Sequence, residues 1–191
     1  HSIGLLYSAF TFYLGFKVNS GEYKVMGLAP YGEPRFAVLI KENLLKLHSD
    51  GSFSLNMEYF EFATGLKMTN EKFDKLFGMP VRNSESDLSQ FHMDVAASIQ
   101  LVTEELVLSL GREISKVTGL KSLCLAGGVA LNCVANAVLD RSKIFEDIWS
   151  QPARAHAGFH PHEASQHGRG APFRVRAIRR LRRGAHARVR P

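Results

Sequence analysis

Residues 124–132 read Cys-Leu-Ala-Gly-Gly-Val-Ala-Leu-Asn, an apolar run that leads through two glycines into a second apolar run. Residues 123–126 predict a buried strand, and residues 129–139 predict a helix. Glycine allows the backbone to approach a bulky ligand, and the free N–H groups at the start of a helix favour phosphate. The segment is therefore compatible with a phosphate site, and also with a tight turn that binds nothing.

Hydrophobic periodicity predicts the elements around this turn. We expect a helix over 3–16, an ordered loop over 21–32, a helix over 35–47, a strand over 53–59, a short helix over 71–77 and a strand over 144–149. The longest predicted helix begins near Asp87 and stops at Gly119, with Asp87 and Gln90 at the spacing of a capping box. A strand, a glycine turn, a helix and a further strand are typical of the α/β class.

Charge is distributed unevenly along the chain. Residues 1–150 carry 14 Lys and Arg against 17 Asp and Glu, whereas residues 151–191 carry 10 Arg and the single acid Glu163. Three interpretations of the tail are open: a basic arm that binds nucleic acid or membrane, a solvated tail without a function, or GC-rich codons read in a shifted frame. We favour the shifted frame, because the composition changes abruptly where the fold should continue.

The chain opens on His1 rather than Met, so we expect a fragment or a processed product. Residues 1–16 are uncharged, but they are too short and too rich in Tyr, Ser and Thr for a membrane span, and they lack the basic start of a signal peptide. Cys124 and Cys133 form no metal or redox motif. We therefore expect two buried thiols in a cytoplasmic protein that binds no membrane.

Three motifs follow one another in a characteristic order. They read His-Ser-Ile-Gly-Leu-Leu-Tyr at 1–7, Gly-Glu-Tyr-Lys-Val-Met-Gly-Leu-Ala-Pro-Tyr-Gly at 21–32 and Leu-Ala-Gly-Gly-Val-Ala-Leu-Asn at 125–132. Together they resemble the carbamoyltransferases of the nodulation-protein and antibiotic O-carbamoyltransferase type. The resemblance implies an α/β fold over 1–153, namely the second half of an actin-like ATPase (ribonuclease H-like) domain with a mixed sheet and flanking helices. Residues 154–191 then form a separate tail.

The resemblance also implies an activity. In that family a separate YrdC-like domain makes carbamoyl-adenylate from carbamoyl phosphate and ATP, and the actin-like domain moves the carbamoyl group to a hydroxyl of a sugar, nodulation factor or antibiotic. ATP, carbamoyl phosphate and a small hydroxylated acceptor are thus the expected cofactor and substrates, and nucleic acid is not an expected partner. The YrdC-like domain is missing from this sequence, so we expect the chain alone to be inactive.

Site residues are implied only where this sequence matches the family motifs. The nucleotide-binding positions are Ser2, Gly4, Lys24, Met26, Gly27, Gly127, Gly128 and Asn132. Lys24 could stabilise the charge of a phosphate as a nearby cation. The alternative interpretation is that Lys24 is a surface lysine without a role in binding. The alternative for Ser2 is a helix cap. No residue is assigned as catalytic.

Two departures from the family pattern concern an iron-type metal. The family's His-x-x-x-His ligands would lie upstream of His1, and the position of its metal-binding aspartate holds His156. We therefore expect no metal ligand in this chain. A sugar kinase of the same superfamily and a nucleic-acid-binding module with a basic tail stay open as alternative functions, although residues 24–32 argue against the kinase.

Overall fold

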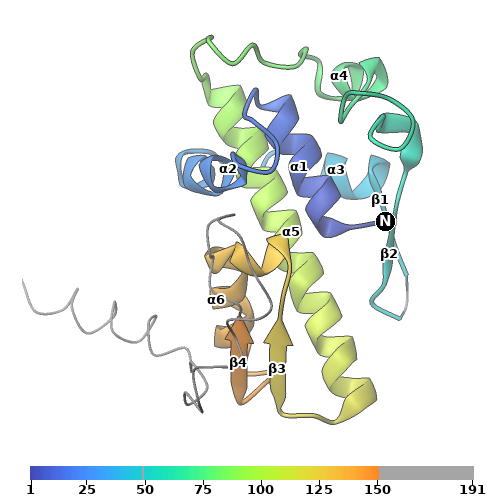
Figure 1. The fold of residues 1–191 in the computed structure, drawn as a ribbon, viewed down its shortest axis with the longest axis vertical. Coiled ribbons are helices and arrows are strands. Elements are labelled where there is room, and N and C mark those ends of the chain that lie inside the picture. Colours follow the sequence, from blue (N-terminus) through green and yellow to red (C-terminus); the bar gives the residue numbers. More distant parts are fainter. Residues whose placement is uncertain (49, 151–191) are drawn as a thin grey trace, which may run out of the picture.

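The 29-residue helix α5 (Gln90–Thr118) runs the length of the fold, and the other elements pack along it (Figure 1). The computed structural model describes residues 1–48 and 50–150. Helices α1 (Ile3–Tyr13), α2 (Glu22–Leu28) and α3 (Ala37–Asn43) contact α5, as does α6 (Cys133–Ser142). A short helix α4 (Glu71–Phe77) and the 3-10 turns η1 (Ala29–Tyr31), η2 (Met57–Tyr59) and η3 (Gly128–Leu131) complete the helical part.

The strands form two separate pairs. Strand β1 (Leu45–Leu47) is antiparallel to β2 (Phe53–Leu55), with Leu45 opposite Leu55. Strand β3 (Ser122–Leu125) is parallel to β4 (Asp147–Ser150), with Ser122 opposite Asp147. The predicted α/β class is confirmed, but within the described ranges the parallel and antiparallel pairs belong to different sheets rather than to one mixed sheet.

Two hydrophobic clusters lie along α5. The larger cluster joins α1, α3, α4 and the first half of α5, and its aromatic rings pack edge to face, with the Phe10 and Phe73 centroids 5.2 Å apart. The smaller cluster is centred on Leu139, Phe145 and Ile148 beneath β3 and β4. Because α5 supplies side chains to both clusters, it fixes the parallel strand pair relative to the N-terminal helices.

The predicted loop over 21–32 is wrong. Residues 22–28 form helix α2, and the 3-10 turn η1 follows it directly. The glycines and the proline that suggested a loop lie where a helical chain tolerates them: Gly21 precedes α2, and Pro30 occupies the first turn of η1, where its missing N–H is not needed. Only Gly27 stands inside the helix.

The predicted cap of the long helix is displaced by two residues. Ser89 is the N-cap, and His92 takes the place of the expected Gln90: the Ser89 N–H donates to His92 Nδ1 at 3.0 Å. Burial, with Arg82 nearby, lowers the pKa of His92, so the ring keeps the neutral form that accepts this bond. The usual capping-box pattern has Glu or Gln at this position, which is why the sequence did not reveal it. The predicted stop at Gly119 is confirmed, with φ 64°.

Five other expectations differ in part. The helix predicted over 3–16 ends at Tyr13, and the strand predicted over 144–149 begins at Asp147. The helix predicted over 35–47 ends at Asn43, and the strand predicted over 53–59 ends at Leu55. The helix predicted over 129–139 is split into η3 and α6, because the chain turns at Asn132. The short helix predicted over 71–77 is confirmed, and the predicted tail lies outside the described residues.

Both cysteines are exposed rather than buried. Side chains alternate along a strand, and in β3 the half-buried Leu123 and Leu125 pack on the smaller cluster while Cys124 points to the opposite face. No described element covers that face. Cys133 is the first residue of α6 and lies on its outer side.

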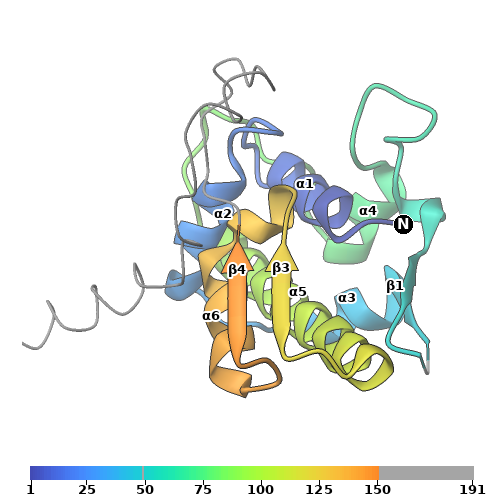
Figure 2. The same ribbon diagram turned by 60° about the horizontal axis from the view of Figure 1, so that its bottom comes forward.

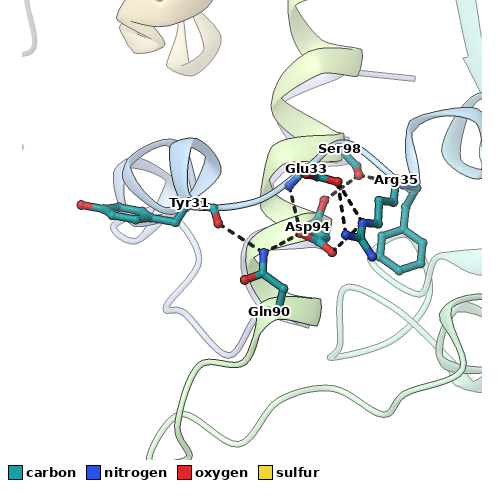
Figure 3. Close-up of polar contacts among 7 residues, drawn as sticks. Tyr31, Glu33, Arg35, Gln90, Asp94 and Ser98 are labelled. Atoms are coloured by element: carbon teal, nitrogen blue, oxygen red, sulfur yellow. Dashed lines mark hydrogen bonds and ion pairs between the residues drawn. The ribbon is translucent and has the colours of Figure 1, made fainter.

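Asp94 joins α5 to the segment that follows η1 (Figure 3). Its carboxylate is buried, and Oδ1 accepts hydrogen bonds from the Glu33 N–H at 2.9 Å and from Gln90 Nε2 at 2.8 Å. Arg35 Nε lies 3.4 Å from Oδ2. One turn further along α5, Ser98 Oγ accepts from the Phe36 N–H at 2.9 Å. The hydrogen bonds from Glu33 and then Gln90, with the charge of Arg35, lower the pKa of Asp94.

Gly32 marks the closest approach of this segment to α5, and its replacement tests the packing. A Cβ on Gly32 would lie 2.1 Å from the backbone carbonyl of Met93, which cannot move within the helix. We expect Gly32→Ala to destabilise the chain by about 2–3 kcal/mol or more in urea unfolding. Gly27→Ala is the control, because nothing lies within 4 Å there and alanine in a helix gains about 0.5–1 kcal/mol. Equal stability of the two variants would contradict the close packing.

Asp94→Asn tests the buried carboxylate. The variant should lose about 1–3 kcal/mol at neutral pH, because the N–H donors of Glu33 and Gln90 lose a charged acceptor. A folded-state pKa below the unfolded value means that the stabilisation is complete above about pH 4 and is lost as the pH falls further.

Unfolding of the wild type and of Asp94→Asn should therefore converge on acidification below about pH 4. Glu105→Gln on the same helix is the control: it breaks an exposed pair with Lys41 at 2.9 Å, which should cost less than about 1 kcal/mol. If the free energies of unfolding of the wild type and of Asp94→Asn differ by the same amount down to about pH 2, the charge of Asp94 is not the source of the stability difference.

Candidate functional site

The glycine turn leaves β3 as an open stretch of backbone. Gly127 has φ 95°, a conformation that favours glycine, and Gly128 begins η3. Both residues are exposed, and a Cβ on either would meet nothing within 4 Å. The missing side chains therefore leave room for a group from outside the chain rather than for a neighbour within it.

The start of α1 lies beside this turn (Figure 2). A Cβ on Gly4 would be 3.7 Å from Val129 Cγ2, the side chain that follows the two glycines. Ser2 is the N-cap of α1, and its Oγ accepts from the Leu5 N–H at 3.3 Å. Its observed contact is thus the helix cap that the sequence offered as an alternative. The start of α1 thus contacts η3, which leads directly into α6. The N-terminus of a helix carries free N–H groups and the positive end of the helix dipole.

The sequence assigned two side chains of α2, Lys24 and Met26, to the site, and only Met26 lies near the start of α6. Met26 Sδ lies 3.8 Å from Cys133 Sγ at the start of α6, and Gly27 follows it with open space around its Cα. Lys24 points elsewhere: its Nζ lies 5.8 Å from the centre of the Phe16 ring, beyond the C-terminal end of α1. The structure therefore places Gly4 beside the residue that follows the two glycines and Met26 beside the start of α6, and it leaves the ammonium group of Lys24 apart.

Asn132 lies in the site, but its side chain points inward. It is the N-cap of α6, where its Oδ1 accepts from the Ala135 N–H at 3.0 Å. Its Nδ2 donates to Oε1 of Gln100 on α5 at 2.9 Å, and Gln100 Nε2 donates back to Asn132 Oδ1 at 3.2 Å. Sequence reasoning missed Gln100. The sequence contained one signal for it: Gln100 is polar, whereas the residues directly before and after it are apolar or small.

Tyr7 extends this pair to α1. Its hydroxyl donates to Gln100 Oε1 at 3.0 Å, and the ring is buried. Burial, with additional repulsion from Glu104 and Glu22, raises the pKa of Tyr7 well above its ordinary value. The hydroxyl therefore stays protonated and keeps its role as a donor. Tyr7 thus combines packing in the larger cluster with a polar contact to α5.

The described residues do not fit the metal of the family. Among residues 1–48 and 50–150, no three His, Cys, Asp or Glu side chains gather closely enough to hold an ion. His156, at the position of the family's aspartate, lies outside the described residues. The same residues contain no helix that is both long and apolar enough to cross a bilayer.

Comparison with known proteins identifies similar chains. A family model described as "Carbamoyltransferase N-terminus" matches residues 1–160. An uncharacterised protein of Synechocystis sp. is 65% identical over 158 residues, which cover 83% of this chain and 26% of that protein. Nodulation protein NolNO of Sinorhizobium fredii is 40% identical over 82% of this chain and 21% of its own length.

A further nodulation protein, NolO of Bradyrhizobium diazoefficiens, is 38% identical over 83% of this chain and 27% of its own length. The chain thus spans about a quarter of the length of these relatives. The matched region contains all three motifs and every element that positions the glycine turn. The chain belongs to the carbamoyltransferase family, in the region described as its N-terminus.

Proposed function

We propose that this chain is the nucleotide-facing part of an enzyme that transfers a carbamoyl group from carbamoyl-adenylate to a hydroxyl of a small acceptor. The observation that carries the proposal is the open glycine turn, which lies beside the start of α1 and leads through η3 into α6. Such a place suits the phosphate of an adenylate, because unobstructed backbone and a nearby helix N-terminus favour an anionic group. Membership of the carbamoyltransferase family supplies the reaction class.

The proposed reaction has three steps. In the family's YrdC-like domain, water would first cleave carbamoyl phosphate to carbamate and inorganic phosphate. A carbamate oxygen would then attack the α-phosphorus of ATP, and pyrophosphate would leave, which gives carbamoyl-adenylate. The acceptor hydroxyl then attacks the carbamoyl carbon, and the bond from this carbon to the phosphate oxygen breaks. AMP leaves with the bonding electrons, and the acceptor oxygen loses its proton. The glycine turn would stabilise the negative charge that grows on the departing phosphate.

The finer assignments belong to the same proposal. We infer an actin-like ATPase domain, because a glycine turn between a strand and a helix is its expected nucleotide contact. The strand β3 is only half-buried here, rather than buried as the sequence predicted. Backbone at Gly127 and Gly128 would face the phosphate, with Ser2, Gly4, Met26 and Gly27 around it. Lys24 would reach the nucleotide only after leaving Phe16, a contact worth about 0.5–1 kcal/mol at an exposed site.

Gly128→Ala tests the turn without disturbing the described fold, because the added methyl group meets no atom of residues 1–48 and 50–150 within 4 Å. The test protein is the full-length Synechocystis relative with its matching segment replaced by residues 1–150. Given ATP, carbamoyl phosphate and a panel of hydroxylated acceptors, this chimera should form pyrophosphate and AMP. Gly128→Ala should slow AMP formation by about tenfold or more, because the adenylate is displaced from its productive position.

Pyrophosphate release reports the activation step and serves as the internal control, since the proposal expects Gly128→Ala to leave it unchanged. The melting temperature should also stay that of the parent chimera. Unchanged AMP formation in Gly128→Ala would remove the glycine turn from the reaction. Failure of both the relative and the chimera to consume ATP in the presence of carbamoyl phosphate would overturn the proposed function.

Lys24→Met tests the proposed role of the lysine charge. Methionine keeps an unbranched side chain that can pack on Phe16 but removes the cation. If Lys24 contacts phosphate in the complex, the affinity of the chimera for an adenine nucleotide should fall by about fivefold at low salt. Lys46→Met, on the exposed face of β1, is the matched control and should bind as the parent does. Equal affinities of the two variants would make Lys24 a surface lysine.

A further inference from the structure

Gln100 uses its whole hydrogen-bonding capacity beneath the glycine turn. Oε1 accepts from Tyr7 Oη at 3.0 Å and from Asn132 Nδ2 at 2.9 Å. Nε2 donates to Asn132 Oδ1 at 3.2 Å and to Glu104 Oε1 at 2.8 Å. Gln100, Tyr7 and Asn132 are all at least nine-tenths buried. A buried network of this kind stabilises one arrangement, because any other leaves polar groups unpaired.

Each amide contacts one group that can only accept or only donate a hydrogen bond, and this contact fixes the orientation of the amide. The Glu104 carboxylate can only accept, so Nε2 of Gln100 must face it. The backbone N–H of Ala135 can only donate, so Oδ1 of Asn132 must face the start of α6. With these atoms in place, the two amides form a reciprocal pair, and only Oε1 of Gln100 remains for the Tyr7 hydroxyl.

We propose that Gln100, oriented by Tyr7, positions the glycine turn through Asn132. Tyr7 lies on α1, Gln100 on α5, and Asn132 at the junction of η3 and α6. The network therefore links α1 and the middle of α5 to the chain that follows Gly127 and Gly128. Neither Gln100 nor Tyr7 touches the open space beside the glycines, so both are positioning residues.

This inference rests on the proposed function, because it assigns Gln100 and Tyr7 to the site that would hold the adenylate phosphate. Helix α6 already has its cap from Asn132 Oδ1. The bond from Asn132 Nδ2 to Gln100 is not needed for capping, so its effect is to hold the turn against α5.

The first measurement is hydrogen exchange on the whole 191-residue chain, which requires no ligand. Tyr7→Phe removes one hydroxyl from the network and should speed exchange of the amides at 127–135 by about tenfold, the factor expected for one buried hydrogen bond. Tyr13→Phe is the matched control: its hydroxyl is also on α1 and donates to Met79 O at 2.7 Å, far from the turn. It should leave exchange at 127–135 unchanged.

The second measurement is single-turnover AMP formation in the chimera. Tyr7→Phe should slow it by about tenfold at saturating nucleotide, because the turn is displaced rather than the ligand contacts removed. Tyr13→Phe should not slow it, although it loses a comparable hydrogen bond. Asn132→Asp keeps the capping oxygen and loses only the donor to Gln100, so it should reproduce the effect of Tyr7→Phe and provides a second variant if one of them does not fold.

The outcomes separate this inference from the proposed function. Faster exchange at 127–135 together with slower AMP formation in Tyr7→Phe supports the positioning role. Exchange at 127–135 that matches that of Tyr13→Phe overturns it, whatever reaction the enzyme catalyses. Faster exchange with unchanged AMP formation would show that the network stabilises the fold and does not serve the transfer step. Failure of both the Synechocystis relative and the parent chimera to consume ATP with carbamoyl phosphate would refute the proposed function, and with it this role in transfer.

Discussion

The buried middle of α5 is the constraint on which the other elements depend. Residues 94–100 are buried on every side of the helix, so its polar side chains there must find partners within the protein. Asp94 and Ser98 bind the backbone that follows η1, and Gln100 binds Asn132 and Tyr7. Each bond fixes a different segment to one rigid helix. The apolar residues supply most of the burial, and these polar residues determine which loops lie where.

The two ends of α5 differ in how they are covered. The first half is enclosed by α1, α2, α3 and η1. Among the described residues, the second half packs on α6 and the smaller cluster and has more peripheral contacts with Lys41 and with the turn at Gly51. Toward its C-terminus the large side chains are exposed, with Val117 at 74% and Leu120, just beyond the helix, at 63%. The glycine turn lies at the boundary between these halves. Its position therefore depends on contacts with the well-packed half, which the amide pair provides.

The sequence predicted the elements whose signals are local and strong. The period of α5, the stop at Gly119 and the strand before the two glycines follow from spacing and from glycine. Helix α2 was missed because Gly and Pro suggest loops unless tertiary contacts favour a helix, and α2 packs on both α1 and α5. The burial of the cysteines was predicted from apolar neighbours, but burial depends on which face of a strand pair is covered.

The sequence predicted the place of the candidate site better than the role of its members. Motif spacing brought Asn132 beside Gly127 and Gly128, but it gave no direction for the amide, which is turned inward by Ala135 and Gln100. The side chains that remain at the turn are those of Val129 and Ala130, which are apolar. A ligand at this turn would therefore meet backbone N–H groups and helix dipoles, which recognise phosphate in any nucleotide. Under the proposed function, selectivity for the acceptor would come from residues outside this turn.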